Sequence, residues 1–331
     1  MMQQAWLDQV SEEIIDAERP ICDPHHHLWD NDDNPYLLPQ LLSDTGSGHN
    51  IVNTVFVECS SMYRAGGDEA LKPVGETEFV NGTAAMMSSG YYGEMRGCAG
   101  IVGFANLLLG AAVGPVLDEH LRCSSRFRGI RHAAAFDPSP DIRKSHVDPP
   151  PQLYLRDDFR EGFAELAGRD LSFDAWLFHP QIGELTELAR AFPDTRIILD
   201  HFGGPLGIGP YAGKQDEIFP NWQRAISELA NCSNVFAKLG GMVMPINGFG
   251  FHKRKLPPGS DEIVAVTGRY YEHTIECFGA ERCMFESNFP VDRQSCSYSI
   301  LWNAFKKMAA RYSAAEQDRL FHGTAVDVYR L

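Results

Sequence analysis

The chain shows its fold in the stretch Ile197-Ile198-Leu199-Asp200-His201-Phe202-Gly203-Gly204. Its apolar residues predict a strand covered by helices on the outside, and the glycine pair permits a tight turn at the strand's end. Similar runs recur along the chain. The eight predicted strands are 20–23, 53–59, 99–105, 127–132, 172–178, 196–201, 235–239 and 282–287.

Helical patterns fill the intervals between these strands. We expect helices at 76–88, 113–123, 159–167, 182–191, 219–230, 264–278 and 299–312. This alternation predicts an α/β protein, a closed (β/α)8 barrel of the TIM type. We divide the chain into an N-terminal extension, 1–19, and one barrel domain, 20–331. Long inserts follow the fourth and seventh strands, at 137–158 and 247–261, where barrel loops build active sites.

The composition is that of an ordinary globular protein with an acidic surface. The 331 residues include 29 Lys and Arg against 44 Asp and Glu, which gives a net charge of −15. This balance argues against nucleic acid or a membrane as partner, because phosphate contacts need clustered Lys and Arg. A small carboxylated substrate remains compatible with it, since one pocket can oppose the overall sign. We expect a monomer or a homodimer.

The cysteines and the N-terminal sequence favour a cytoplasmic location. The chain has no apolar run of membrane-spanning length, and residues 1–20 lack the pattern of a secretory signal. None of the eight cysteines forms a Cys-x-x-Cys pair, and several lie in apolar runs. We therefore expect buried free thiols in a reducing compartment.

The motif Asp23-Pro24-His25-His26-His27 carries the strongest chemical signal. Alternate residues of a strand share a face, so Asp23, His25 and His27 are expected to point the same way. Two imidazoles at this spacing can approach one zinc, manganese or iron ion.

Two further histidines end predicted strands. His179 closes the fifth strand and His201 the sixth, at the edge where barrel enzymes keep their catalytic groups. Asp200 is expected to point to the face opposite His201 and to act as a structural partner.

In this set of motifs the chain resembles the amidohydrolase superfamily, and within it the amidohydrolase 2 branch, which includes pyrone-dicarboxylate and sugar lactonases. The resemblance implies a hydrolase in which His25, His27, His179 and His201 bind one or two divalent ions that activate water. Some lactonases of this branch work without metal, so zinc, manganese or no metal all stay open. The matching pieces are Asp23-x-His25-x-His27, Phe127-Arg128-Gly129-Ile130-Arg131, Phe178-His179-Pro180-Gln181, Leu199-Asp200-His201-Phe202-Gly203, Lys238-Leu239 and Ser287-x-Phe289-Pro290.

The chain departs from the family pattern at the eighth strand. The family's Ser-Asp-Trp-Pro reads Ser287-Asn288-Phe289-Pro290 here. An amide is no general base, although Asn288 can orient a water molecule. The base is then Glu286, two residues away on the same predicted face, or Asp292, or Glu58. A reaction that needs no such carboxylate, and a loss of catalysis, are the remaining alternatives.

Cationic residues near strand ends predict a substrate with a carboxylate. Arg131 is expected to point inward and to pair with that group through its guanidinium. The other candidate substrate-binding residues are Tyr63, Arg64, Lys238 and Glu58.

The sequence thus predicts an enzyme that hydrolyses a small cyclic ester, a carboxylated lactone, or a related C–O or C–N bond. One alternative is a non-oxidative decarboxylase on the same barrel, in which a metal ion and the histidines stabilise a carbanion-like state. Another is a non-catalytic barrel that binds a metal or a ligand.

Overall fold

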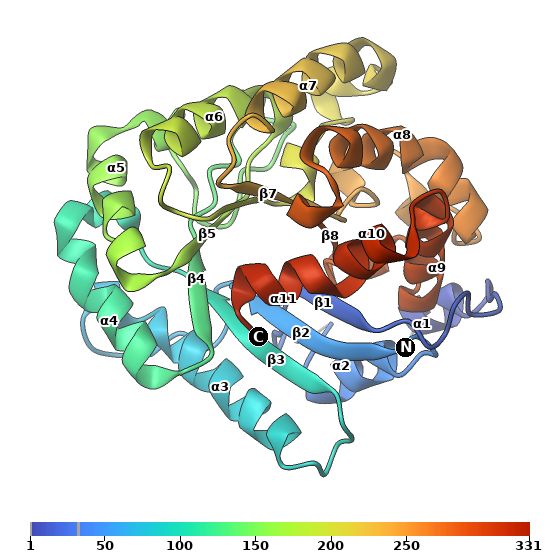
Figure 1. Ribbon diagram of the computed structural model, residues 1–331, viewed down its shortest axis with the longest axis horizontal. Coiled ribbons are helices and arrows are strands. Elements are labelled where there is room, and N and C mark those ends of the chain that lie inside the picture. The colour runs from blue at the N-terminus through green and yellow to red at the C-terminus, as the bar shows by residue number, and fades with distance from the viewer. Residues whose placement is uncertain (1, 32–33) are drawn as a thin grey trace.

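The computed structural model describes residues 2–31 and 34–331, and in these ranges one sheet of eight parallel strands runs in sequence order (Figure 1). The predicted (β/α)8 barrel is confirmed. The strands are β1 (Ile21–His26), β2 (Ile51–Val57), β3 (Arg96–Gly103), β4 (Phe127–Arg131), β5 (Ser172–Ala175), β6 (Ile197–Leu199), β7 (Val235–Leu239) and β8 (Cys283–Phe285).

Helices surround this sheet, as Figure 1 shows for α3 to α8. No helix in the described ranges is both long and apolar enough to span a membrane. The helices are α1 (Met2–Leu7), α2 (Leu38–Thr45), α3 (Val74–Ser88), α4 (Gly114–Cys123), α5 (Asp157–Ala164), α6 (Ile182–Ala191), α7 (Gln215–Leu229), α8 (Ser260–Phe278), α9 (Tyr298–Ala309), α10 (Ala314–Asp318) and α11 (Thr324–Tyr329).

Several strands end earlier than the sequence predicts. β6 stops at Leu199 and β8 at Phe285, because His201 and Asn288 adopt left-handed backbone angles, with φ of 52° and 55°. Such angles are uncommon outside glycine and turn the chain out of the sheet. Consecutive side chains can then reach the barrel interior together, which strict alternation forbids.

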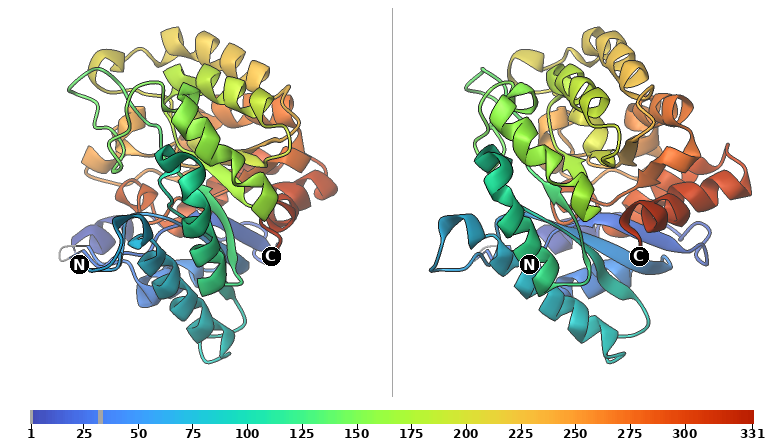
Figure 2. Two further views of the ribbon diagram at one scale, coloured as in Figure 1. Left: turned by 90° about the vertical axis from the view of Figure 1, so that its left-hand side faces the viewer. Right: turned by 60° about the vertical axis from the view of Figure 1, so that its left-hand side comes forward.

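The two ends of the barrel differ in chemistry. At the end where the strands begin, α11 packs against inward-facing apolar residues, among them Val55, Val102 and Ile198. The other end is open and carries the long loops after β4 and β7, which lie on the same side of the molecule (Figure 2). Ile142 from the first loop and Ile246 from the second meet in one small apolar cluster.

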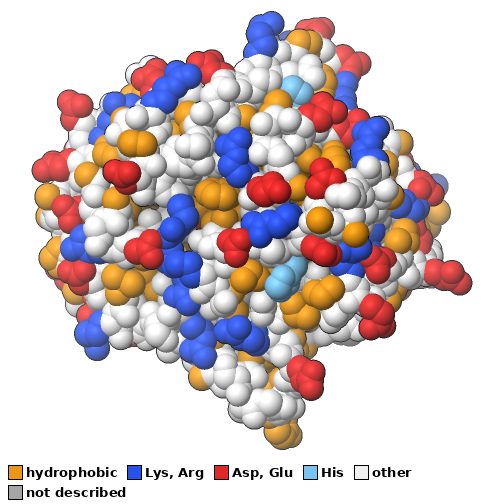
Figure 3. Space-filling model, viewed as in Figure 1, with side chains coloured by type: hydrophobic (Ala, Val, Ile, Leu, Met, Phe, Trp, Pro, Cys, Tyr) orange, Lys and Arg blue, Asp and Glu red, His pale blue; other side chains and the backbone are white. Residues whose placement is uncertain are grey.

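The charged side chains and the cysteines are distributed much as the composition suggests. On the face shown in Figure 3, Lys and Arg side chains are interspersed with Asp and Glu, so the net charge is dispersed there. All eight cysteines are free thiols, as expected, and five of them are buried.

Asp23 joins the first strand to the last. Its buried carboxylate accepts hydrogen bonds from the backbone N–H of Ser287 at 2.9 Å, the Ser287 hydroxyl at 2.6 Å and the Tyr298 hydroxyl at 2.9 Å. The expectation that Asp23 faces the same way as His25 is therefore wrong. The register of β1 against β2 shifts between Asp23 and His26, and this irregularity breaks the alternation.

Replacing Tyr298 with Phe is expected to lower the free energy of unfolding by about 1–3 kcal/mol, because a buried carboxylate loses one of its donors. Denaturant unfolding of Tyr298→Phe measures this loss. Tyr91→Phe is the matched control, since Tyr91 is 86% exposed. Equal stability of the two variants would show that Asp23 does not need the Tyr298 hydroxyl.

Candidate active site

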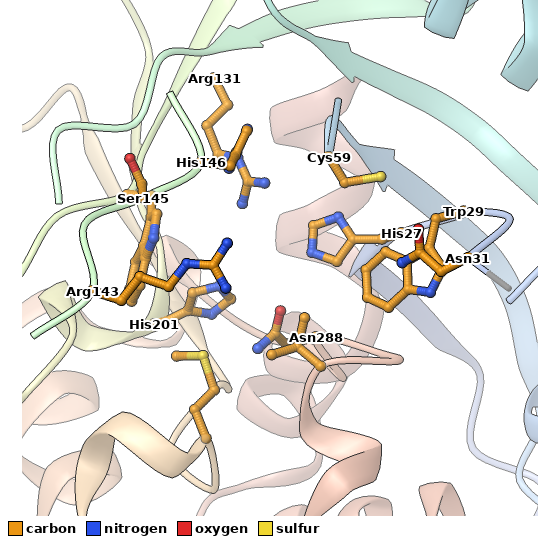
Figure 4. Close-up of a pocket in the computed structure, with 13 residues that line it drawn as sticks. His27, Trp29, Asn31, Cys59, Arg131, Arg143, Ser145, His146, His201 and Asn288 are labelled. Carbon is orange, nitrogen blue, oxygen red and sulfur yellow. The ribbon is translucent and has the colours of Figure 1, made fainter. Parts of the chain in front are cut away.

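A cavity of about 420 Å³ opens at the carboxyl ends of the strands (Figure 4). Among the described residues its wall holds three histidines and two arginines but no carboxylate. In a protein of net charge −15 this is a local reversal of sign. The wall residues are His27, Trp29, Asn31, Cys59, Arg131, Arg143, Ser145, His146, Trp176, His201, Met244, Asn288 and Val291.

The first-strand histidines converge as the spacing predicts. The Nε2 atoms of His25 and His27 lie 3.3 Å apart, and His26 turns away toward Thr54. The Nδ1 atom of His27 is 2.8 Å from the carbonyl oxygen of Val57. Because a carbonyl only accepts, this nitrogen carries the proton, and Nε2 of His27 presents a lone pair to the cavity.

Glu286 lies beneath the histidines and contacts two of them. Its Oε1 is 2.6 Å from Nδ1 of His201, and its Oε2 is 2.8 Å from Nδ1 of His25. Burial raises the pKa of this carboxyl, but the two imidazoles outweigh burial and lower it to about 2. Glu286 is fully buried and does not reach the cavity wall, whereas its partner His201 does.

A layer of buried charge lies below the histidines. Lys238 bonds to Asp174 at 2.6 Å and lies 3.2 Å from both Asp200 and Nδ1 of His25. Tyr329, from α11 at the far end of the barrel, donates its hydroxyl to Asp174 at 2.7 Å. Burial opposes the charge of Lys238, but Asp174 and Asp200 raise its pKa. The side chain expected to bind substrate is thus fully buried.

Asp200 also corrects the strand-face argument. Its carboxylate lies inside the barrel, 3.7 Å from both His25 and Arg131, although His201 is inside as well. The left-handed backbone at His201 removes the alternation on which the expectation rested.

Arg131 points inward and is held by Glu58. Its Nε donates to Oε1 of Glu58 at 2.7 Å and its Nη2 to the Glu58 backbone carbonyl, while Nη1 lies 3.4 Å from Nε2 of His25. The other Glu58 oxygen is 2.8 Å from Nε2 of His146. Burial alone would raise the pKa of Glu58, but Arg131 and His146 lower it to about 2. Glu58 is therefore a partner of Arg131 and His146 rather than a free base.

Asn288 reaches the cavity wall and is oriented from behind. Its amide nitrogen donates to Asp292 at 3.0 Å, which leaves the amide oxygen to accept from a ligand or water. Burial raises the pKa of Asp292 well above its ordinary value, and this residue does not reach the wall.

Three predicted site residues lie elsewhere. Nδ1 of His179 accepts from the backbone N–H of Leu206 at 3.2 Å, and its ring packs on Tyr211, outside the cavity wall. Tyr63 lines a separate pocket, and Arg64 pairs with glutamates on the surface.

Sequence reasoning missed several residues that the structure brings to the site. Arg143, Ser145 and His146 come from the loop after β4, which the sequence marks only as an insert. Trp176 follows β5, and its side chain packs on His201 with ring centroids 5.0 Å apart. An acid inside an apolar strand was the available signal for Asp174.

The donor set fits a divalent cation. Two imidazole nitrogens that bind one tetrahedral zinc at about 2.0–2.1 Å lie roughly 3.3 Å apart, which is the separation of His25 and His27. His25, His201 and Asp200 also bring ligand atoms within 4.8 Å of one another. Both Asp200 oxygens lack a well-aligned hydrogen-bond donor within the described residues.

The buried charges favour a cation as well. The carboxylates Glu58, Asp174, Asp200 and Glu286 are fully buried, as is Lys238, and Arg131 is 5% exposed. Within this group carboxylates outnumber permanent cations four to two, and a buried charge without a partner is costly.

Glu58→Gln is expected to lower the free energy of unfolding at pH 7 by about 3–5 kcal/mol, because it leaves Arg131 without its buried partner. A carboxyl whose pKa is lowered on folding stabilises the protein above its unfolded pKa of 4.5. The difference in the free energy of unfolding between wild type and Glu58→Gln should therefore become smaller as the pH falls from about 4.5 toward 2. Denaturant unfolding between pH 7 and 3 tests this, with the exposed Glu69→Gln as control. A difference that does not change with pH would contradict it.

Comparison with known proteins agrees with this geometry. A family model described as amidohydrolase, Amidohydro_2, matches residues 22–331. An uncharacterized protein of Sinorhizobium fredii is 33% identical over 333 residues, 94% of this chain and 98% of that one. L-fucono-1,5-lactonase of Burkholderia multivorans is 28% identical over 208 residues, 62% of this chain and 64% of the enzyme.

A solved structure shows the same fold. An amidohydrolase of Burkholderia multivorans with bound zinc has a TM-score of 0.71 and 23% identity to this chain, over 94% of this chain and 99% of that one. Because the family model and the Sinorhizobium relative both match nearly the whole length, this chain belongs to the amidohydrolase 2 family.

Proposed function

We propose that the protein hydrolyses the ester bond of a small lactone that carries a carboxylate. The observation that carries the proposal is the pair of Glu286 and His201, placed so that one imidazole edge faces the cavity. The similarity to an enzyme named L-fucono-1,5-lactonase supports an ester substrate.

His201 is the proposed general base. The carboxylate of Glu286 accepts from Nδ1 of His201, which fixes the tautomer and leaves Nε2 to take a proton from water. Glu286 is thus a positioning residue that stabilises the imidazolium formed when the water attacks. The oxygen of Asn288 accepts the second hydrogen of that water and orients it.

The lactone carbonyl is polarised by cationic and metal-binding groups. Arg131 holds a permanent positive charge at the cavity wall, with its Nη1 directed at the histidines. A divalent ion, zinc or manganese, would be held by the Nε2 atoms of His25 and His27 with Asp200 as a further donor, and when bound it would supply a Lewis acid for the carbonyl or the water. His201 would keep its Nε2 free for the proton of the water, with Glu286 bonded to its Nδ1.

The wall also suits an anion. Among the described lining residues the charged side chains are arginines, with histidines beside them and no acid. Trp29 and Trp176 add flat apolar surface to the wall. A small ring with a carboxylate matches both features.

Ring opening releases a proton, so a pH-indicator assay tests the function directly. We expect turnover on a panel of γ- and δ-lactones, and a fall in kcat of about 10²–10⁴ in Glu286→Gln with little change in KM. The exposed Glu281→Gln is the matched control. Release of carbon dioxide from aromatic acids without lactone turnover would make the protein a decarboxylase. Ligand binding without either reaction would make it a binding protein.

We expect the untagged protein to contain about one divalent ion per chain. Elemental analysis is the measurement, before and after dialysis against a chelator. Asp200→Asn should weaken retention of the ion about 10-fold or more, whereas Asp216→Asn, which changes a carboxylate paired with Arg269 on the surface, should not. A metal-free protein with undiminished turnover would overturn this assignment and leave the reaction to the chain's own residues.

A further inference from the structure

The loop after β4 extends an arginine into the cavity. Arg143 stands at the mouth, and Figure 4 shows its guanidinium directed toward the centre of the cavity. Among the described residues, no carboxylate lies within ion-pair distance of Arg143. Arg131, in contrast, has two of its three nitrogens bonded to Glu58. Within the described residues, Arg143 is thus the arginine of the wall that keeps a hydrogen-bonding edge open to a ligand.

Ser145 adds a second donor on the same side. Its hydroxyl oxygen is buried and has no hydrogen-bond partner within the described part of the chain, although the residue lines the cavity. Residues 143–145 are outside helices and strands, and Arg143 and Ser145 both reach the wall. Lys144, between them, turns outward to Asp148 at 2.9 Å and to the ring of Phe136.

The segment is fastened on both sides of these donors. Before Arg143, the buried Ile142 packs in the apolar cluster with Phe178 and Leu206. After Ser145, His146 contacts Glu58 at 2.8 Å, and Glu58 also bonds to Arg131 in the cavity wall. The backbone N–H of Ser145 also donates to the carbonyl of Ala135 at 3.1 Å. A segment fixed at both ends loses little entropy when its side chains bind a ligand.

We infer that Arg143 and Ser145 form the subsite that binds the substrate's carboxylate. The inference rests on the proposed lactone hydrolysis and replaces Arg131 as the residue that recognises the anion. A guanidinium and a hydroxyl offer charged and neutral hydrogen bonds to the two oxygens of one carboxylate. Specificity for an acidic lactone therefore resides in the loop, whereas Arg131 serves the reacting end of the ring.

A pair of substrates that differ only in charge tests the subsite. The probes are 5-oxotetrahydrofuran-2-carboxylate and its primary amide. We expect wild type to prefer the carboxylate, and Arg143→Gln to lower kcat/KM about 10-fold or more on the carboxylate while the amide is unaffected. Arg143→Lys should retain part of the preference, and Ser145→Ala should lose a smaller part of it.

Lys144→Gln is the matched control, because it removes the same charge from the neighbouring position of the same loop. Lys144→Gln should change kcat/KM on neither substrate. Equal losses on both substrates in Arg143→Gln, or an effect of Lys144→Gln as large as that of Arg143→Gln, would overturn the inference. So would a wild type that hydrolyses carboxylate and amide equally well.

Binding without turnover separates this inference from the proposed function. Calorimetry with glutarate, an unreactive dicarboxylate, is expected to show binding about 10-fold weaker in Arg143→Gln and unchanged in Lys144→Gln. If no lactone is hydrolysed but glutarate binding depends on Arg143, the proposed function fails and the subsite stands. If lactones are hydrolysed but glutarate binds Arg143→Gln as well as wild type, the proposed function stands and the subsite fails.

Discussion

The burial of several ionised side chains inside the barrel is the constraint on which the site depends. A charge removed from water is tolerated only when partners replace its hydration. Lys238 therefore lies between Asp174 and Asp200, and Arg131 is bonded to Glu58. Tyr329 supplies a further hydrogen bond from α11, so the C-terminal helix helps to support the histidines although it lies at the opposite end of the barrel.

The residues that follow β8 lie next to the same buried layer. Asn288 stands where the resemblance to the family leads us to expect an aspartate, and Glu286 lies two residues earlier. That carboxylate does not reach the cavity; it lies under His25 and His201 and contacts both. In the reaction we propose, the proton of the water passes to an imidazole, whose ordinary pKa is far closer to neutrality than that of an aspartate. In this proposal the carboxylate acts through a histidine.

The sequence predicts the structural features that repeat along the chain, and it misses the side-chain directions that depend on single backbone angles. The eight strands and most helices follow from apolar periodicity, and the convergence of His25 with His27 follows from alternation along a strand. The inward position of Asp200 and the outward position of Asp23 do not, because a left-handed residue and a register shift break that alternation. The positions of Arg143 and Ser145 could not be predicted from the sequence for another reason. Their positions depend on contacts of a long loop with distant strands, which no local pattern encodes.

The site has two parts that differ in how firmly each is held. One is the floor, which consists of the buried ion pairs of Arg131 with Glu58 and of Lys238 with Asp174 and Asp200. The other is the loop at 143–145. Because each of these floor residues is paired with another, a change in the floor disturbs several ion pairs at once and threatens both fold and chemistry. The loop contacts the floor through His146, which lies 2.8 Å from Glu58, and it offers Arg143 without a charged partner among the described residues. Substitutions in such a loop change what is bound at little cost to the barrel.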